Sequence, residues 1–224
     1  MDNCPRDNGA AGCAASIDSR SAPRFTLLLR TAKLVADGRE FLCILRDASA
    51  TGIKLRIFHP VPPHRLLQLE LGSGERHAIE QVWTTHDHAG FRFCEEIAVA
   101  KLIDDAAGAF PKRQLRLRIS LPATIHSGGE TCPISFCDIS QQGARIACDK
   151  RLMMNELVRI ETRFLPPIYA KVRWRREPQY GLVFEHPFRL DELARISAPL
   201  QLADPEDLAD CSPRADIRPS EASR

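Results

Sequence analysis

One six-residue pattern occurs twice in this sequence and fixes the number of folded units. Residues 47–52 (DASATG) and 138–143 (DISQQG) both read D-x-S-x-x-G, and the two copies are 91 residues apart. Other residues recur at the same spacing, namely Gly38 and Gly129, Trp83 and Trp174, Gly90 and Gly181, and Phe93 and Phe184. Because several independent positions share one offset, the sequence predicts two copies of a unit of about 90 residues. Two copies are too few for a stacked solenoid, so each unit is expected to have its own hydrophobic core.

The two ends of the chain differ in composition from these units. The first 19 of the 224 residues are mostly small and polar, and the residues from about 204 onward are polar with several Pro and Ser. Such segments bury too little apolar surface to fold by themselves. We therefore divide the chain into a disordered arm (1–19), a first domain (20–107), a second domain (108–200) and a disordered tail (201–224).

Both units are expected to consist mainly of short antiparallel strands. Residues 53–57 (IKLRI) alternate apolar and basic side chains, as a half-buried strand does, and Asp37-Gly38 is a typical hairpin turn. The same reasoning gives strands at 25–35, 41–45, 53–57, 67–71, 78–83 and 90–93, and in the second unit at 115–125, 134–137, 144–147, 157–162, 168–174 and 181–184. A helix is expected after the last strand of each unit, at 95–107 and 191–196. The predicted fold class is all-β with short helices, arranged as a small barrel or sandwich.

The composition argues against several classes of function. A formal net charge of +2 gives no overall attraction to nucleic acid or to a membrane, and no apolar run reaches the roughly 18 residues of a membrane helix. The first eight residues lack the apolar stretch of a secretion signal. The eight cysteines include no C-x-x-C pair, and several lie in or beside apolar runs. We therefore expect a cytoplasmic protein with reduced thiols.

Basic residues precede each copy of the D-x-S-x-x-G pattern. In the first unit they are Arg20 and Arg24, spaced R-x-x-x-R, and in the second they are Lys112, Arg113 and Arg116. Arginine can stack on a purine or bind guanine O6 and N7 through two hydrogen bonds. An aspartate accepts N–H donors, and a glycine lets a ligand approach the backbone closely. The combination predicts a pocket for an anionic ligand that carries bases.

The order of these motifs resembles that of the PilZ domain, a family of bacterial receptors for the second messenger cyclic di-GMP. The resemblance rests on R-x-x-x-R followed by D-x-S-x-x-G, on a later strand with a Trp and on a closing G-x-x-F strand. It covers about residues 20–103 and 112–196. It implies two tandem six-stranded antiparallel β-barrels, each closed by a short C-terminal helix. It also implies that the arginine arm folds over a ligand held on the outer face of the barrel.

The resemblance implies a cyclic di-GMP site in the first unit. Its residues are Arg20 and Arg24, which would contact guanine and phosphate, and Asp47, Ser49 and Gly52, which would form the opposite wall. The dianionic ligand would order the arm and shift one unit relative to the other, because it binds the ordered state preferentially. A downstream protein, which the sequence does not identify, would read that change.

A weaker second site is expected in the second unit. Its residues are Lys112, Arg113, Arg116, Asp138, Ser140 and Gly143. A lysine at the first arm position supplies a point charge without the planar fork of an arginine. We therefore expect the first unit to bind the ligand more tightly than the second.

Other functions are weighed against the receptor hypothesis. No nucleophile–base–orienter combination is evident, so neither catalytic residues nor an enzyme activity is expected. Residues 86–88 (HDH) are interpreted as a solvated turn rather than a metal site, and no cofactor is implied.

The basic run 112–118 alternates with leucines as a strand does, which argues against nucleic-acid binding. Trp83 and Trp174 are interpreted as core or barrel-closing aromatic residues rather than as stacking platforms. The alternative function is a degenerate PilZ-like module that binds a protein and no nucleotide.

Overall fold

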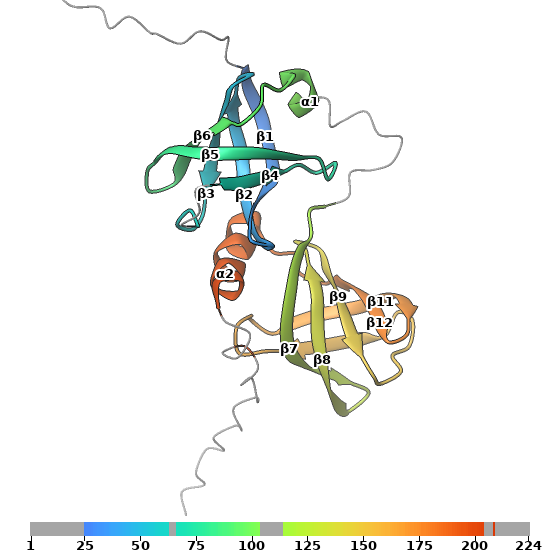
Figure 1. Cartoon of the computed structure of the whole chain (residues 1–224). Coiled ribbons are helices and arrows are strands. Elements are labelled where there is room, and N and C mark those ends of the chain that lie inside the picture. The colour runs from blue at the N-terminus through green and yellow to red at the C-terminus, as the bar shows by residue number, and fades with distance from the viewer. Residues whose placement is uncertain (1–24, 63–65, 104–113, 204–207, 209–224) are drawn as a thin grey trace, which may run out of the picture.

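The chain folds into two β-barrels with a helix between them (Figure 1). The computed structural model describes residues 25–62, 66–103, 114–203 and 208. The predicted arm and almost all of the predicted tail lie outside the described residues, as do Arg20, Arg24, Lys112 and Arg113. Predictions that depend on these four basic residues therefore stay predictions.

Six antiparallel strands form the first barrel. They are β1 (Phe25–Ala36), β2 (Arg39–Ala48), β3 (Gly52–Ile57), β4 (Leu66–Glu70), β5 (Arg76–Thr84) and β6 (His88–Phe93). They follow one another around the barrel in the order β1-β2-β3-β6-β5-β4, and β1 pairs with both β2 and β4 to close it. The closure decides between the barrel and the sandwich that the strand pattern left open.

The second barrel repeats this arrangement. Its strands are β7 (Leu117–Ser127), β8 (Glu130–Ile139), β9 (Gly143–Cys148), β10 (Leu157–Glu161), β11 (Ile168–Arg176) and β12 (Gln179–Phe184). The order is β10-β11-β12-β9-β8-β7, and pairing of β7 with β10 closes the barrel. The duplication inferred from sequence spacing is therefore confirmed as two barrels of the same topology.

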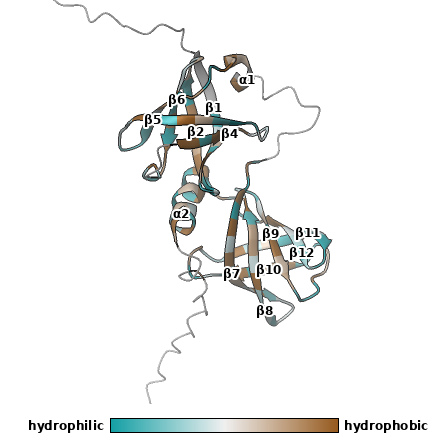
Figure 2. Cartoon of the chain, in the orientation of Figure 1, coloured by the Kyte–Doolittle hydropathy of each residue, from teal (hydrophilic) through white to brown (hydrophobic). Residues whose placement is uncertain are grey.

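Alternating side chains and tight turns explain why these residues form barrels. In β7 every second residue is buried, so one face of the strand lines the core. Apolar residues are distributed over the strands of both barrels (Figure 2), and each barrel has its own cluster of buried residues. The β1–β2 hairpin turns at Asp37 and Gly38, both with positive φ, as a two-residue turn that matches the strand twist requires.

The helices differ from their sequence predictions. The helix expected at 95–107 is the single turn α1 (Val99–Ile103) within the described residues, and residues 95–98 are not helical. The helix expected at 191–196 is α2 (Leu190–Leu202), which is longer at both ends. Leu193 and Leu200 of α2 belong to the core of the second barrel, whereas Ala198 belongs to that of the first. Helix α2 therefore packs against both barrels. The part of the helix beyond residue 196 includes Ala198 and Leu200, which are buried in these contacts.

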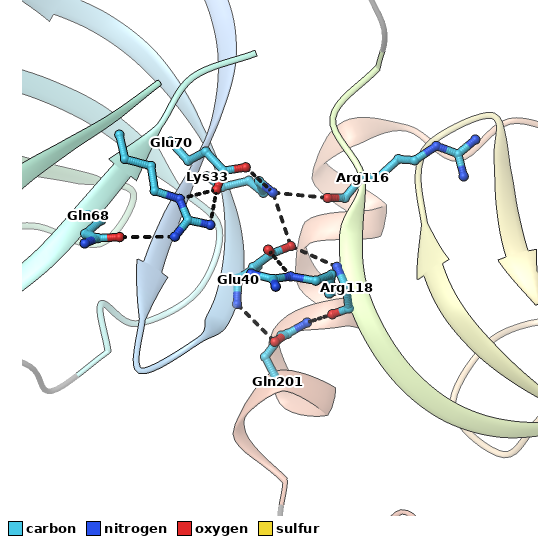
Figure 3. A network of polar contacts seen from close by, with 8 residues as sticks. Lys33, Glu40, Gln68, Glu70, Arg116, Arg118 and Gln201 are labelled. Carbon is cyan, nitrogen blue, oxygen red and sulfur yellow. Dashed lines mark hydrogen bonds and ion pairs between the residues drawn. The ribbon is translucent and has the colours of Figure 1, made fainter. Parts of the chain in front are cut away.

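A buried charge network joins the two barrels (Figure 3). Glu40 of β2 is 1% exposed, and its carboxylate accepts hydrogen bonds from the backbone N–H and the Nε of Arg118, both at 2.8 Å. Lys33 of β1 lies 3.2 Å from the same carboxylate and donates to the Arg116 carbonyl at 3.3 Å. Gln201 of α2 accepts from the Glu40 N–H and donates to the Arg118 carbonyl. Strand β2, strand β7 and helix α2 are thus each hydrogen-bonded to the other two.

Candidate functional site

The serine of each D-x-S-x-x-G pattern builds the turn itself. The Ser140 N–H donates to the Gly143 carbonyl at 2.8 Å, and its hydroxyl donates to the same oxygen at 3.0 Å. Ser49 makes the equivalent pair of bonds to the Gly52 carbonyl. Ser140 is 2% exposed and Ser49 is 8% exposed. Both serines therefore hold the turn closed, and this local role explains their place in the pattern.

The glycine of the pattern permits close packing between strands. A Cβ on Gly143 would collide with the Leu182 carbonyl oxygen of β12, and one on Gly52 would lie 3.2 Å from the Phe91 carbonyl oxygen of β6. Because β9 pairs with β12 directly after Gly143, any side chain there would push the two strands apart. The glycines thus place the turn against the barrel.

Asp138 holds two arginines at the edge of the second barrel. Its Oδ1 lies 2.6 Å from Nη1 of Arg116, and its Oδ2 lies 2.8 Å from Nε of Arg145. Asp138 is only 7% exposed, whereas the side chains of the two arginines are 46% and 38% exposed. Each carboxylate oxygen therefore forms an ion pair with one guanidinium group, and both arginine side chains stay partly exposed.

These residues line a cleft between the two barrels with a volume of about 780 Å³. The second barrel contributes Arg116, Asp138, Arg145 and Trp174, and the first contributes Lys33 with the segment 70–74 between β4 and β5. Figure 3 shows the Arg116 guanidinium directed away from Lys33, toward the second barrel. The cleft is thus bounded on one side by the D-x-S-x-x-G turn of the second barrel and on the other by the first barrel.

The charged side chains that line this cleft have a net positive charge. Glu70 lies 2.5 Å from Lys33 and 2.7 Å from Arg76. Burial acts to raise the pKa of the Glu70 carboxyl, but hydrogen bonds to Lys33 and Arg76 and their charges outweigh it and lower the pKa below 4.5. Glu70 is therefore ionised at neutral pH. Among the described lining residues the cleft has three cations against two carboxylates, which suits an anionic ligand.

The two tryptophans are not core residues, in contrast to the sequence interpretation. Trp83 and Trp174 are 42% and 41% exposed, and their indole rings lie against Gly90 and Gly181 on the neighbouring strands. A Cβ on either glycine would collide with the ring. The ring covers backbone on the outer face of the barrel, where a glycine leaves room for it. Trp174 consequently lines the cleft with one side of its indole accessible.

We expect Gly181→Ala to destabilise the second barrel by about 1–3 kcal/mol, the usual cost of overpacking a close contact. The added methyl group would displace the Trp174 indole from its seat on Gly181. Urea unfolding followed by circular dichroism measures the loss. Gly129→Ala is not a suitable control because its φ of 81° is itself strained, whereas Ala147→Gly tests a change on the same sheet that leaves Trp174 in place. Unchanged stability in Gly181→Ala would contradict this packing.

The first barrel has a smaller hollow at its own D-x-S-x-x-G turn. Its volume is about 220 Å³, and Asp47, Gly52, Lys54 and Trp83 are among its lining residues. Within the described residues, the Asp47 carboxylate has no ion pair, unlike Asp138. Arg20 and Arg24, which the sequence predicts to act at this turn, lie outside the described residues.

Several cleft residues were not among the predicted site residues. Arg145 lies two residues after Gly143, Lys33 is on β1, and the segment 70–74 belongs to the other barrel. The alternation of β9 gave a signal for Arg145, because a residue two places after the turn glycine faces the same side of the sheet. Lys33 and the 70–74 segment gave no such signal, since only the packing of one barrel on the other brings them to the cleft.

The cysteines and histidines among the described residues do not form a second candidate site. The described cysteines are free, and burial raises the pKa of the Cys43 and Cys148 thiols, that of Cys148 to about 11. His88 Nδ1 lies 2.7 Å from its neighbour Asp87. Among the described residues, no group of three or more His, Cys, Asp or Glu is placed to hold a metal ion. None of the helices in this part of the chain has the length and hydropathy needed to cross a membrane.

The chain thus combines two closed β-barrels with a cleft between them whose described lining has more cations than carboxylates. Residues 111–199, which contain the second barrel with its turn, match the PilZ domain family. Residues 111–199 are therefore a PilZ domain, which forms the second of the two β-barrels of the chain. A search of curated proteins found no significant match to the chain.

Solved structures of low sequence identity are also similar to the chain. The Borreliella burgdorferi PlzA protein in complex with c-di-GMP is 15% identical with a TM-score of 0.33, and the match covers 75% of this chain and 87% of that one. Bacillus subtilis MotI/DgrA, an inhibitor of motility, is 13% identical with a TM-score of 0.32, covering 75% and 93%. Escherichia coli YcgR in complex with c-di-GMP is 11% identical with a TM-score of 0.27, covering 69% and 75%.

Proposed function

We propose that this protein is a cytoplasmic, non-enzymatic receptor for cyclic di-GMP, and that the ligand occupies the cleft between the second barrel and the first. The observation that carries the proposal is the pair of arginines on Asp138 at the edge of a cleft of about 780 Å³. This volume is within the range of small-ligand sites, roughly 300–1,000 Å³. The PilZ family match over residues 111–199 includes the same turn.

The chemistry of the lining supports a dianionic ligand with purine bases. Arg116 and Arg145 each have guanidinium nitrogens left over after binding Asp138, and such nitrogens can donate to phosphate or to guanine O6 and N7. The accessible face of Trp174 can stack on a base. Asp138 and Ser140 would act by positioning, because their polar atoms are already engaged within the protein.

The same cleft offers a way for binding to be transmitted. Lys33 lines the cleft and also bonds to Glu40 and to the Arg116 carbonyl at the joint between the barrels. A ligand that contacts both barrels binds one of their arrangements more tightly than others and shifts the population toward it. A downstream protein would then recognise the favoured arrangement.

Titration calorimetry with cyclic di-GMP tests this proposal. At micromolar protein we expect the heat of binding to saturate, with the ligand bound at the second barrel. Binding should be weaker at higher salt because the ligand is anionic. Binding at the first barrel, through Arg20, Arg24, Asp47, Ser49 and Gly52, would appear as a second set of sites. The absence of heat at every temperature tried, with no rise in the melting temperature, would overturn the receptor proposal.

The alternative is a PilZ-like module that binds a protein without nucleotide. One observation favours a protein-binding surface: Met153, Met154 and Leu157 are 61%, 48% and 51% exposed and lie close together in the sequence before and within β10. Exposed apolar side chains of this kind are typical of interaction sites. Tight association with a protein partner that is unaffected by cyclic di-GMP would favour this alternative.

A further inference from the structure

The two units distribute their arginines differently around the D-x-S-x-x-G turn. Upstream of the turn the first unit has two arginines, whereas the second has a lysine, Lys112, at the first of the two positions. Two residues after the turn glycine the relation is reversed. The second unit has Arg145, and the first has Lys54 at the position 91 residues earlier. An arginine and a lysine have thus exchanged places between the two copies.

The geometry shows what Arg145 does in the second barrel. Its Nε lies 2.8 Å from Asp138, which is its only ion-pair partner among the described residues. Asp138 is nearly buried, and its other oxygen binds Arg116, so the carboxylate fixes both guanidinium groups in place. The Nε of Arg145 is buried and makes only this ion pair, without a hydrogen bond, among the described residues. The ion pair through Nε leaves the two Nη groups to form the planar fork that can donate two parallel hydrogen bonds.

Arg145 lies beside the aromatic surface of the cleft. In the pairing of β9 with β12 its register partner is Gly181, the residue that the Trp174 indole covers. Arg145 and Trp174 both line the cleft. A purine that stacks on the accessible face of Trp174 therefore presents an edge toward Arg145.

We propose that Arg145 is a ligand-contacting residue that determines base specificity in the second barrel. It reads the O6 and N7 acceptors of a guanine stacked on Trp174, and Asp138 is the residue that positions it. The reason for guanine is chemical: guanine offers two acceptors to a guanidinium fork, whereas adenine places an amino donor where guanine has O6. This inference rests on the proposed function, because it assigns the base contact within that cleft.

Arg145→Lys is the test. Lysine keeps the positive charge and can keep the ion pair with Asp138, but it lacks the fork. We expect the ratio of the cyclic di-AMP to the cyclic di-GMP dissociation constant to fall by roughly tenfold or more, in line with the discrimination of a bidentate arginine–guanine pair. The salt dependence of cyclic di-GMP binding should stay the same because the charge is kept. A general loss of structure would weaken both ligands together and leave the ratio unchanged.

Arg159→Lys is the matched control. Arg159 is an exposed arginine of β10, paired with Glu161 and not among the residues lining the cleft, so its replacement should leave both dissociation constants unchanged. Trp174 fluorescence in a Trp83→Phe background gives an independent readout, since stacking of a base should quench it in both the parent and the Arg145→Lys protein.

The outcomes separate the two proposals. If the unmodified protein binds no cyclic di-GMP, the proposed function fails. If it binds and Arg145→Lys retains the full preference for cyclic di-GMP over cyclic di-AMP, the receptor proposal stands and the role of Arg145 is wrong. Binding without quenching of Trp174 would remove the stacked base from the proposal.

Discussion

Arg116→Ala should weaken cyclic di-GMP binding by about 100-fold, the upper part of the range for a hydrogen bond to a charged group, roughly 1.5–3 kcal/mol. Arg116 is the one residue of the predicted arginine arm that lies among the described residues, and its guanidinium is held on Asp138 at 2.6 Å beside the cleft. Its loss removes a fixed cation from the site while Arg145 still neutralises Asp138. Titration calorimetry measures the change.

The comparison with Arg24→Ala decides which barrel holds the ligand more tightly. The sequence favours the first unit, because it has the complete R-x-x-x-R pair. The cleft geometry favours the second, because its turn faces a cleft of about 780 Å³ rather than the 220 Å³ of the first. Full binding by Arg116→Ala together with a large loss in Arg24→Ala would place the tighter site in the first barrel. Arg159→Ala, outside the cleft, controls for a general effect of charge.

Glu40→Ala should lower the free energy of unfolding by about 3–5 kcal/mol, the cost of removing one partner of a buried ion pair. Glu40 is 1% exposed and binds the backbone N–H and Nε of Arg118 as well as Lys33. Without it, Lys33 loses one of its two carboxylate partners, and the Arg118 N–H loses its acceptor at the joint. Urea unfolding measures the loss, and small-angle scattering should show a larger radius of gyration as the barrels separate.

Glu80→Ala provides the matched control for this experiment. Glu80 is also a glutamate of the first barrel and pairs with Arg92 at 2.7 Å, but Arg92 is 67% exposed. Exposed ion pairs contribute about 0–1 kcal/mol, so this variant should be close to the parent in stability and in radius of gyration. Equal, small effects of the two substitutions would show that the joint does not depend on Glu40.

The repeat at a spacing of 91 residues determined the duplication, and patterns within short segments determined the fold class and the positions of the two D-x-S-x-x-G turns. These are local properties: alternation within β3 and β7, positive-φ residues at the Asp37-Gly38 hairpin, and a turn whose serine bonds to a glycine three residues later. Each depends on residues near one another in the chain, so each leaves a pattern that can be read directly. The resemblance to the PilZ domain depended on the same local motifs.

Only the tertiary structure decided how the two barrels form one cleft. Lys33 reaches Arg116, and Glu40 reaches Arg118, because β1 and β2 pack against β7 across a large separation in sequence. The extension of α2 to Leu202 and the exposed position of Trp174 over Gly181 also depend on neighbours that are distant in the chain. Packing between elements carries no periodic signal in the sequence. The wall of the cleft formed by Lys33 and the segment 70–74 of the first barrel was therefore beyond the reach of motif and spacing.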